Sequence, residues 1–420
     1  MPSTNIGRVL TAACAIPVLA LSSALAAAQA SIPVRELKNT VSSDTTILMG
    51  LSAVRHLPNG SVLVNDPTKR QLVLFDSTLS KHKVIADTST NSPNSYGLRP
   101  SAGGLIPYVA DSSLFVDSES GAFLVIDPRG DFKRVMAPTR ASDLSFISSA
   151  VFGTAGFDSK GRLIYRAVRR TPQQMMGFGM PVAGQTTFIQ QADSAPIMRM
   201  DLDRRSVDTI AFMKSAIARQ AIVGNSSSMR VINVVNPVPA ADDWAMTPDG
   251  VIAIVRSQDY HIDWLGPDGK MTSTPKMPFD WKRISPEEKQ QIIDSVRKAE
   301  ADRVAKLPPP GPAIPGVFLP TPAPFMTVDA KELPDFYPPV RQGQVRADRE
   351  GNIWILPSTA TGAAVSGLRY DVVNREGVIV ERVQLPKGRT LVGFGPNGTV
   401  YMHNVKSPVR AAIERAQVAR

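Results

Sequence analysis

The amino-acid sequence predicts an all-β fold, a six-bladed β-propeller with a helical and proline-rich insertion between the fourth and fifth blades. Two observations lead to this prediction: turns of one kind recur between short β-prone runs, and a ten-residue register links the second and third runs of several units. Four short antiparallel strands per unit, with no long helix inside a unit, are typical of propeller blades. With 43% hydrophobic residues among 420, the chain can bury a large core, which excludes disorder of the whole chain.

A tight turn joins the first two strands of each expected blade. In the first blade, the turn at Asn59-Gly60 precedes the β-prone run Val62-Leu63-Val64. Glycine and asparagine accept the positive φ with which the chain reverses direction. The corresponding turns lie at residues 57–60, 111–113, 158–161, 248–250, 348–351 and 396–398.

A second register places the third strand of a blade. The residue that closes the second strand and the residue that closes the third strand are ten positions apart. The third strand is a short apolar run, and another β-prone run follows it as the fourth strand. The pairs are Asp66 and Asp76, Asp117 and Asp127, and Arg256 and Gly266.

The last unit is one strand short. Its three runs lie at residues 391–394, 399–403 and 409–414. We therefore expect the N-terminal segment, residues 33–40, to pair into the blade formed by residues 389–416. Such a clasp would close the ring and remove its two free edges.

These residues resemble the exported bacterial six-bladed β-propellers related to NHL repeats. The resemblance covers most of the chain after residue 30, and the third blade departs most from the pattern. It implies the fold and little else, because no common catalytic residues accompany it. The best-matched stretches are residues 242–250, 260–264, 336–339 and 370–377.

The first thirty residues are expected to be a signal peptide. Arg8 precedes an apolar run over residues 9–28, and Ala28-Gln29-Ala30 has the small-x-small form of a cleavage site. A membrane anchor is the alternative, but a proline and a serine pair interrupt the run. The domain expected after cleavage is residues 31–420, exported to the periplasm or outside the cell. It has no transmembrane span and no cysteine, because Cys14 would leave with the signal peptide.

The charge balance is basic, with 47 Lys and Arg against 37 Asp and Glu. Because export separates the chain from nucleic acid, acidic envelope polymers or anionic lipid are the more fitting partners for this charge. A soluble surface with excess cations is the alternative interpretation.

Long connections are expected to share one face of the propeller, because second-to-third-strand loops and blade-to-blade links emerge together. In the longest, Ser285-Pro286 and Glu288 form a capping box that begins a helix, and eight of the residues 308–324 are prolines. We expect an unknown protein, a glycan or a small polar ligand to bind this loop-rich face of a monomer. The connections are residues 168–195, 214–240, 279–340 and 358–367.

Six polar residues are predicted to line the rim of this face. The set could hold a polar ligand or, through oxygen ligands, a calcium ion, whereas local turn capping by aspartate is the alternative. Asp243 and Arg256 are expected to meet as neighbours within one sheet. The candidate ligand-binding residues are Asp66, Asp117, Asp243, Arg256, Tyr260 and His261.

The function expected from these observations is that of a non-catalytic binding or scaffold module, with no catalytic residues assigned. The four histidines are scattered, and no nucleophile elbow or phosphate loop is present. The alternative is a metal-assisted hydrolase or lyase that uses the central funnel of the propeller. The thioethers of Met175, Met176 and Met180 could bind copper, but a flexible apolar loop is the simpler interpretation.

Overall fold

The computed structural model describes residues 32–88, 96, 104–117, 120–169, 186–190, 192–216, 219–223, 230–305, 325–361, 367–407 and 409–420. The predicted signal peptide, the methionines at residues 175–180 and the proline-rich residues 308–324 lie outside this part of the chain. The expectations about them therefore stay predictions. No helix within the described ranges is long and apolar enough to cross a membrane.

The described residues form seven β-sheets, and six of these contain an antiparallel meander of four strands. The second strands β4 and β8 are buried along their whole length, because they lie inside a sheet that is covered on both faces. The first three meanders are β3 (Ala53–His56), β4 (Val62–Asp66), β5 (Gln71–Phe75) and β6 (His82–Ala86); β7 (Leu105–Pro107), β8 (Ser113–Asp117), β9 (Ala122–Ile126) and β10 (Phe132–Met136); and β11 (Gly156–Phe157), β12 (Leu163–Arg166), β14 (Ser194–Asp201) and β15 (Ser206–Lys214).

The last three meanders repeat this order, and the final one takes its outer strand from the start of the chain. The predicted turns at Gly250, Gly351 and Gly398 have positive φ angles of 82°, 87° and 69°, as the reversal requires. These meanders are β18 (Asp243–Met246), β19 (Ile252–Arg256), β20 (His261–Leu265) and β21 (Met271–Ser273); β23 (Arg346–Ala347), β24 (Ile353–Ile355), β25 (Arg369–Val373) and β26 (Ile379–Gln384); and β27 (Arg389–Phe394), β28 (Thr399–Ser407), β29 (Arg410–Val418) and β2 (Leu37–Ser42).

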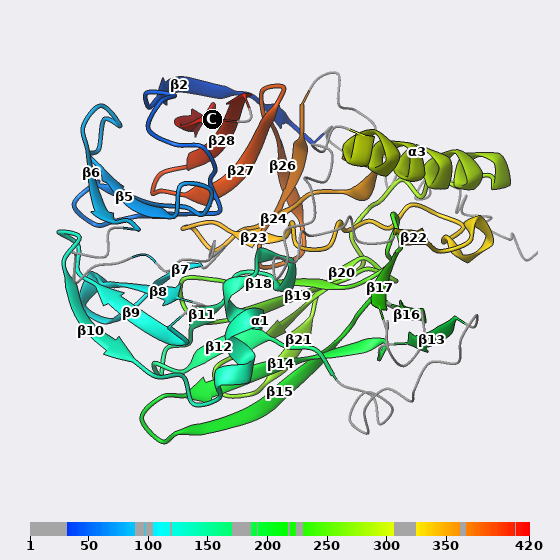
Figure 1. The fold of residues 1–420 in the computed structure, drawn as a ribbon, viewed down its shortest axis with the longest axis horizontal. Coiled ribbons are helices and arrows are strands. Elements are labelled where there is room, and N and C mark those ends of the chain that lie inside the picture. The colour runs from blue at the N-terminus through cyan, green and yellow to red at the C-terminus, as the bar shows by residue number, and fades with distance from the viewer. Residues whose placement is uncertain are drawn as a thin grey trace, which may run out of the picture.

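The N-terminal segment joins two sheets. The predicted pairing with the last meander is confirmed: β2 runs antiparallel to β29, from Leu37 opposite Val418 to Ser42 opposite Glu414. The strand begins later than expected, because β1 (Val34–Arg35) pairs in parallel with β26 of the fifth meander. Figure 1 shows the blue β2 beside the red C-terminal strands.

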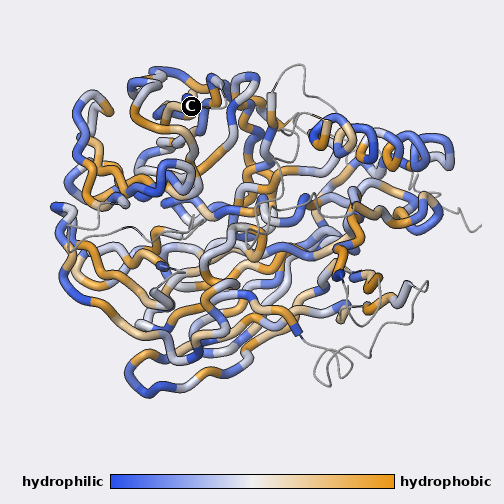
Figure 2. The backbone as a smooth tube through the Cα atoms, in the orientation of Figure 1, coloured by the Kyte–Doolittle hydropathy of each residue, from blue (hydrophilic) through white to orange (hydrophobic). Residues whose placement is uncertain are grey.

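Apolar clusters lie between successive sheets. Six such clusters occur, one at each boundary between successive meanders. The last of them packs Tyr401 and Ile413 of the sixth meander against Val62 and Phe75 of the first. Strand β27 also contacts β3. In Figure 2 the apolar segments lie within the sheets and many of the polar ones at their turns. This mostly β arrangement of radially packed meanders is the β-propeller class.

A separate layer, of which the sequence predicts only the helix, lies beside the meanders. Its core buries Ile232 and Val234 of the sheet against Ile293 of the helix. Strands from distant insertions build this sheet outside the repeat register, so no turn spacing could reveal it. The layer contains β13 (Thr187–Gln190), β16 (Arg219–Val223), β17 (Arg230–Val235), β22 (Met326–Thr327) and α3 (Pro286–Ala305).

Helix α3 begins where the capping box predicts it. The backbone N–H of Glu288 donates to Ser285 Oγ at 3.1 Å, and Pro286 is the first helical residue. The other helical elements are short: η1 (Val109–Asp111), η2 (Ala141–Asp143), α1 (Leu144–Ser148), η3 (Ala150–Phe152), η4 (Ala330–Glu332) and η5 (Ser358–Thr361).

Removing β2 should destabilise the whole fold, because β29 would lose its hydrogen-bonded neighbour and become an exposed edge strand. A chain that begins after Ser42 should lose roughly 3 kcal/mol or more of unfolding free energy from ladder hydrogen bonds alone, and should aggregate. Urea unfolding and light scattering measure both effects, with a chain that begins at Ile32 as the control. Equal stability of the two chains would contradict the clasp.

Candidate functional site

Two of the predicted rim residues, Asp66 and Asp117, cap turns within their own sheets. The buried Asp66 carboxylate accepts hydrogen bonds from the backbone N–H groups of Met49 at 2.8 Å and Thr68 at 3.0 Å, and from others nearby. Asp117 accepts one from the N–H of Ser120 at 3.2 Å. Both side chains therefore serve local turns, which is the alternative that the sequence left open.

The surroundings of Asp66 are those of a turn cap and not of a calcium ligand. A cation needs several converging oxygen ligands, whereas backbone N–H donors surround Asp66. Within the ranges that the structure describes, no three His, Cys, Asp or Glu side chains gather into a group that could hold a metal ion.

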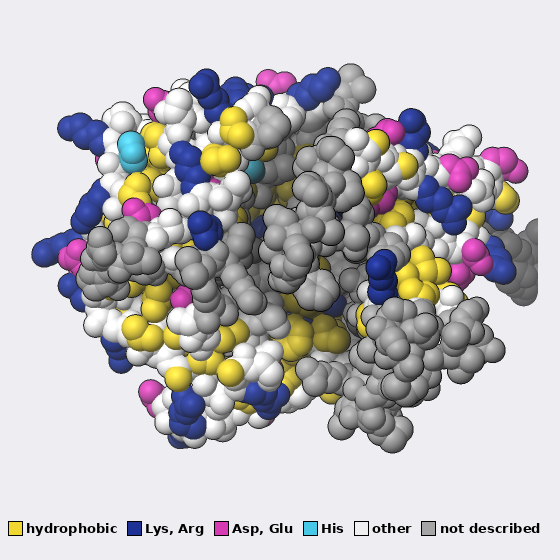
Figure 3. All heavy atoms as spheres, viewed as in Figure 1, with side chains coloured by type: hydrophobic (Ala, Val, Ile, Leu, Met, Phe, Trp, Pro, Cys, Tyr) yellow, Lys and Arg dark blue, Asp and Glu magenta, His cyan; other side chains and the backbone are white. Residues whose placement is uncertain are grey.

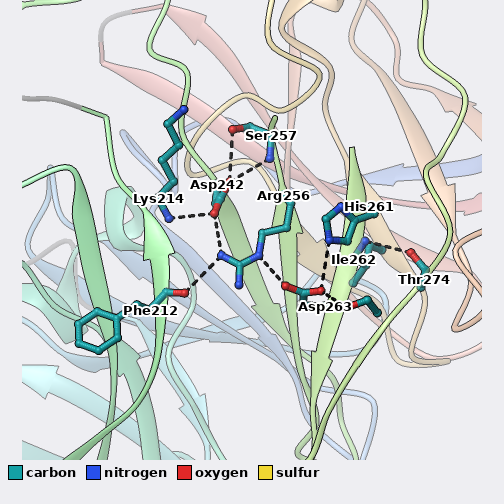
Figure 4. A network of polar contacts seen from close by, with 10 residues as sticks. Phe212, Lys214, Asp242, Arg256, Ser257, His261, Ile262, Asp263 and Thr274 are labelled. Carbon is teal, nitrogen blue, oxygen red and sulfur yellow. Dashed lines mark hydrogen bonds and ion pairs between the residues drawn. The ribbon is translucent and has the colours of Figure 1, made fainter. Parts of the chain in front are cut away.

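Arg256 bridges two carboxylates (Figure 4). Its Nε donates to Asp263 Oδ2 at 2.7 Å and its Nη1 to Asp242 Oδ2 at 2.9 Å. Nη1 also reaches the carbonyl oxygen of Phe212, on the outer strand of the third meander, at 3.3 Å. Burial opposes the charge, yet the two carboxylates outweigh it and raise the pKa of Arg256. The side chain thus ties the third meander to the fourth.

The expectation that Arg256 meets Asp243 is wrong. Asp242 and Asp243 are consecutive, so their side chains leave the strand on opposite sides. Asp242 holds Arg256, while Asp243 Oδ2 accepts hydrogen bonds from the backbone N–H groups of Gln344 at 3.0 Å and Val345 at 2.9 Å. Asp243 therefore faces the segment that leads into β23.

Tyr260 and His261 also point into different surroundings. Tyr260 lies in the apolar cluster between the fourth and fifth meanders, with its ring 5.5 Å from that of Phe279. His261 Nε2 lies 3.3 Å from Asp263 Oδ1, at the edge of the Arg256 network (Figure 4). The predicted residues thus have different partners, although Arg256 and His261 lie directly opposite each other on β19 and β20.

Asp243 is the predicted residue in the most unusual environment. Its side chain is fully buried, and Oδ1 has no hydrogen-bond partner among the described residues. Burial raises the pKa of Asp243, although the N–H of Val345 and the charges of Arg346 and Arg166 act in the opposite direction.

A cavity of about 440 Å³ lies beside the backbone that holds Asp243. We call it the arginine cavity, because Arg341 and Arg346 line it and no carboxylate does. Arg346 Nη1 donates to the carbonyl oxygens of Gly343 and Val345, at 2.9 and 3.0 Å. The side chain of Arg341 makes no hydrogen bond to a described residue. The lining comprises residue 151, residues 237–239, 337–338, 340–344, 346 and 358.

A third arginine, Arg166, lies behind the cavity wall. It is 2% exposed, and burial lowers its pKa while Asp243 and Asp242 act to raise it. With the amide oxygen of Gln342 turned toward it, Arg166 donates two hydrogen bonds to that oxygen, at 2.7 and 3.1 Å. Arg166 Nη2 also donates to Ser215 Oγ at 3.1 Å. Gln342 lines the cavity, so it connects the cavity to the buried cation.

Sequence reasoning missed these arginines. Arg166, Arg341 and Arg346 come from two different blades and belong to no motif, so only the packing of the loop-rich ends brings them together. The one usable signal was their position beside the long connections. Figure 3 shows the other cationic side chains spread around the visible face, not gathered in one patch.

Removing the Arg256 clamp should destabilise the fold. Arg256→Ala leaves two largely buried carboxylates without their cation, which should cost about 3 kcal/mol. Urea unfolding measures the loss. Arg204→Ala is the matched control, because that side chain is 85% exposed and its surface ion pair contributes little. Equal losses in the two variants would contradict the clamp.

The raised pKa of Asp243 should make stability fall as pH rises. The unfolded state loses this proton near its ordinary pKa of about 3.9, whereas the folded state keeps it to higher pH. Parent stability relative to Asp243→Asn should therefore decrease with pH until the folded carboxyl ionises. Urea unfolding at several pH values tests this, and an identical pH dependence of both proteins would refute it.

No family model matches the sequence, and no curated protein matches it. Among solved structures, the chain is similar to a gluconolactonase from Xanthomonas campestris, with 10% identity over 89% of this chain and 88% of that one, at a TM-score of 0.41. It is also similar to a virginiamycin B lyase from Staphylococcus aureus (9% identity, 90% and 99% covered, TM-score 0.40) and to a calcium-binding regucalcin from Agrobacterium tumefaciens (10%, 92% and 95%, 0.37). At TM-scores below 0.5, these likenesses carry no argument about activity or ligand. The order and packing of its own sheets place the chain among mostly β, propeller-like proteins.

Proposed function

We propose that this chain binds a small organic anion in the arginine cavity. A single observation carries the proposal: two arginines line the cavity and no carboxylate does. Buried Arg166 adds a third positive charge behind the wall, through Gln342. An anion there would gain charge-assisted hydrogen bonds in a partly desolvated setting, where they are strongest.

The walls indicate the shape of the ligand. Val151, Val238 and Val340 and several prolines form the apolar part of the lining, opposite in character to the arginines. A volume of about 440 Å³ lies within the range of small-molecule sites. The expected ligand is therefore a carboxylate or phosphate attached to a compact apolar body.

Arg341 is the residue expected to bind the anion. Arg346 already donates to two backbone carbonyls, and Arg166 donates to Gln342 and Ser215. The guanidinium of Arg341 has no such partner in the described part of the chain, so its donors are available to a ligand.

We also propose that the six meanders are the blades of one six-bladed β-propeller, exported as a monomer to the periplasm or the cell exterior. The apolar clusters at six successive boundaries support the blade count. Export depends on the signal-like residues 1–30. The resemblance to NHL-related propellers also stays a prediction.

A hydrolase or lyase acting in the same cavity is the second candidate. Asp243 is the candidate acid, because burial raises its pKa and the backbone N–H of the cavity-lining Gln344 donates to its carboxyl group. Arg341 would then stabilise negative charge that develops on the substrate. The described residues supply no set of metal ligands for a metal-assisted version.

Arg341→Ala should weaken the binding of small anions. The parent protein should bind at least one member of a panel of aromatic and branched aliphatic carboxylates and phosphates, measured by calorimetry. Loss of a charge-assisted hydrogen bond should weaken that member about 10- to 100-fold. Arg204→Ala removes an exposed arginine elsewhere and should bind like the parent.

Failure of the parent to bind any member, or equal binding by Arg341→Ala, would overturn the proposal. Product formation from a bound ester or lactone, lost in Asp243→Asn, would instead establish the enzyme. Binding without turnover would support the non-catalytic function.

A further inference from the structure

A second recess lies on the border between the fourth and fifth meanders, and it shares no lining residue with the arginine cavity. It consists of two adjoining hollows of about 420 and 790 Å³, which share Pro278, Phe279, Asp280 and Arg382 as lining. We call it the Phe279 groove. Its length along residues 278–280 suits an extended ligand.

One aromatic ring, that of Phe279, lines the groove, and two other rings pack against it. Phe279 lines both hollows, and its ring contacts those of Tyr260 and Trp281 edge-on, with centroids 5.5 and 5.1 Å away. Packing on Tyr260 fixes the Phe279 ring, while Trp281 remains 43% exposed beside it. Rings held this way offer a flat apolar surface to a ligand.

Planar polar side chains form the opposite side. Strands β25 and β26 place Arg369 opposite Gln384 and Asp371 opposite Arg382, so all four lie on one face of the sheet. All four also line the smaller hollow. Arg382 Nε donates to Asp371 Oδ1 at 2.8 Å, whereas Arg369 makes no hydrogen bond to a described residue.

A buried tyrosine lies behind the groove lining, with its ring packed against that of Phe279. The Tyr260 hydroxyl is buried and has no partner with hydrogen-bond geometry among the described residues, although burial and the nearby Asp371 carboxylate raise its pKa. Tyr260 also has a φ of 45°, which a residue with a side chain rarely adopts. Strain and unmet hydrogen bonding cluster at binding sites.

We propose that the Phe279 groove binds a saccharide chain. A sugar ring has an apolar face, which can stack on an aromatic ring, and neighbouring hydroxyls that donate and accept at once. Carboxylates such as Asp371 and Asp280 accept from those hydroxyls, while Arg369 donates to them. An acidic peptide or a nucleic acid fits less well, because the same wall carries both charges.

Calorimetry and saturation-transfer NMR with tetrasaccharides test this proposal. The probes are cellotetraose, chitotetraose, maltotetraose and tetragalacturonate, each at millimolar concentration. The parent should bind at least one, and both Phe279→Ala and Arg369→Ala should weaken it roughly tenfold or more. Because the exposed Arg369 side chain makes no hydrogen bond to a described residue, its variant should fold like the parent, which keeps the test valid if Phe279→Ala does not fold.

Arg341→Ala, in the arginine cavity, and Arg204→Ala should bind the saccharide as the parent does. These controls separate the groove from the anion site, so either proposal can fail alone. A parent that binds none of the four probes overturns the inference, as does equal binding by Arg369→Ala and the parent.

Discussion

The structure depends on one constraint: each meander has apolar side chains on both faces and must be covered on both. A single four-stranded sheet of this kind cannot be stable in water, because one face would expose a continuous apolar surface. Six apolar clusters, one at each boundary between successive meanders, satisfy the constraint. The sixth cluster joins β28 and β29 to β4 and β5, so the two ends of the described chain must lie side by side.

The same constraint determines where polar chemistry can lie. Between the sheets there is no room for unpaired charge, so polar side chains gather at the ends of strands and on the connecting segments. Where they are buried there, they are paired, as in the bridge from Arg256 to Asp242 and Asp263. Asp243 and Tyr260 are among the exceptions, since a carboxylate oxygen of the one and the hydroxyl of the other lack a hydrogen-bond partner in the described part of the chain.

Both proposed sites involve segments that enter or leave the fourth and fifth meanders. The segment that leads into β23 forms one wall of the arginine cavity. The segment after β21 lines both hollows of the Phe279 groove through residues 278–280. The longest insertion, residues 279–340, begins and ends at these two places. Its helix packs on the added sheet in a separate apolar core around Ile293, which gives the flanking segments a fixed support. A rigid scaffold with long connections on one end is a usual way to position binding residues.

The sequence by itself determined the repeat, the turns, the helix and the N-terminal strand, because each depends on local chemistry: glycine at positive φ, a capping box, alternating apolar runs. It could not determine the added sheet, since β13, β16, β17 and β22 pair outside any repeat. Nor could it determine the sites. Whether Asp242 or Asp243 meets Arg256 depends on which side of the strand each side chain takes, and a one-residue difference reverses the answer. Arg166 ends β12 of the third meander, whereas Arg341 and Arg346 belong to the segment that opens the fifth. These two meanders are not adjacent, and only the tertiary structure brings Gln342 of that segment into contact with Arg166.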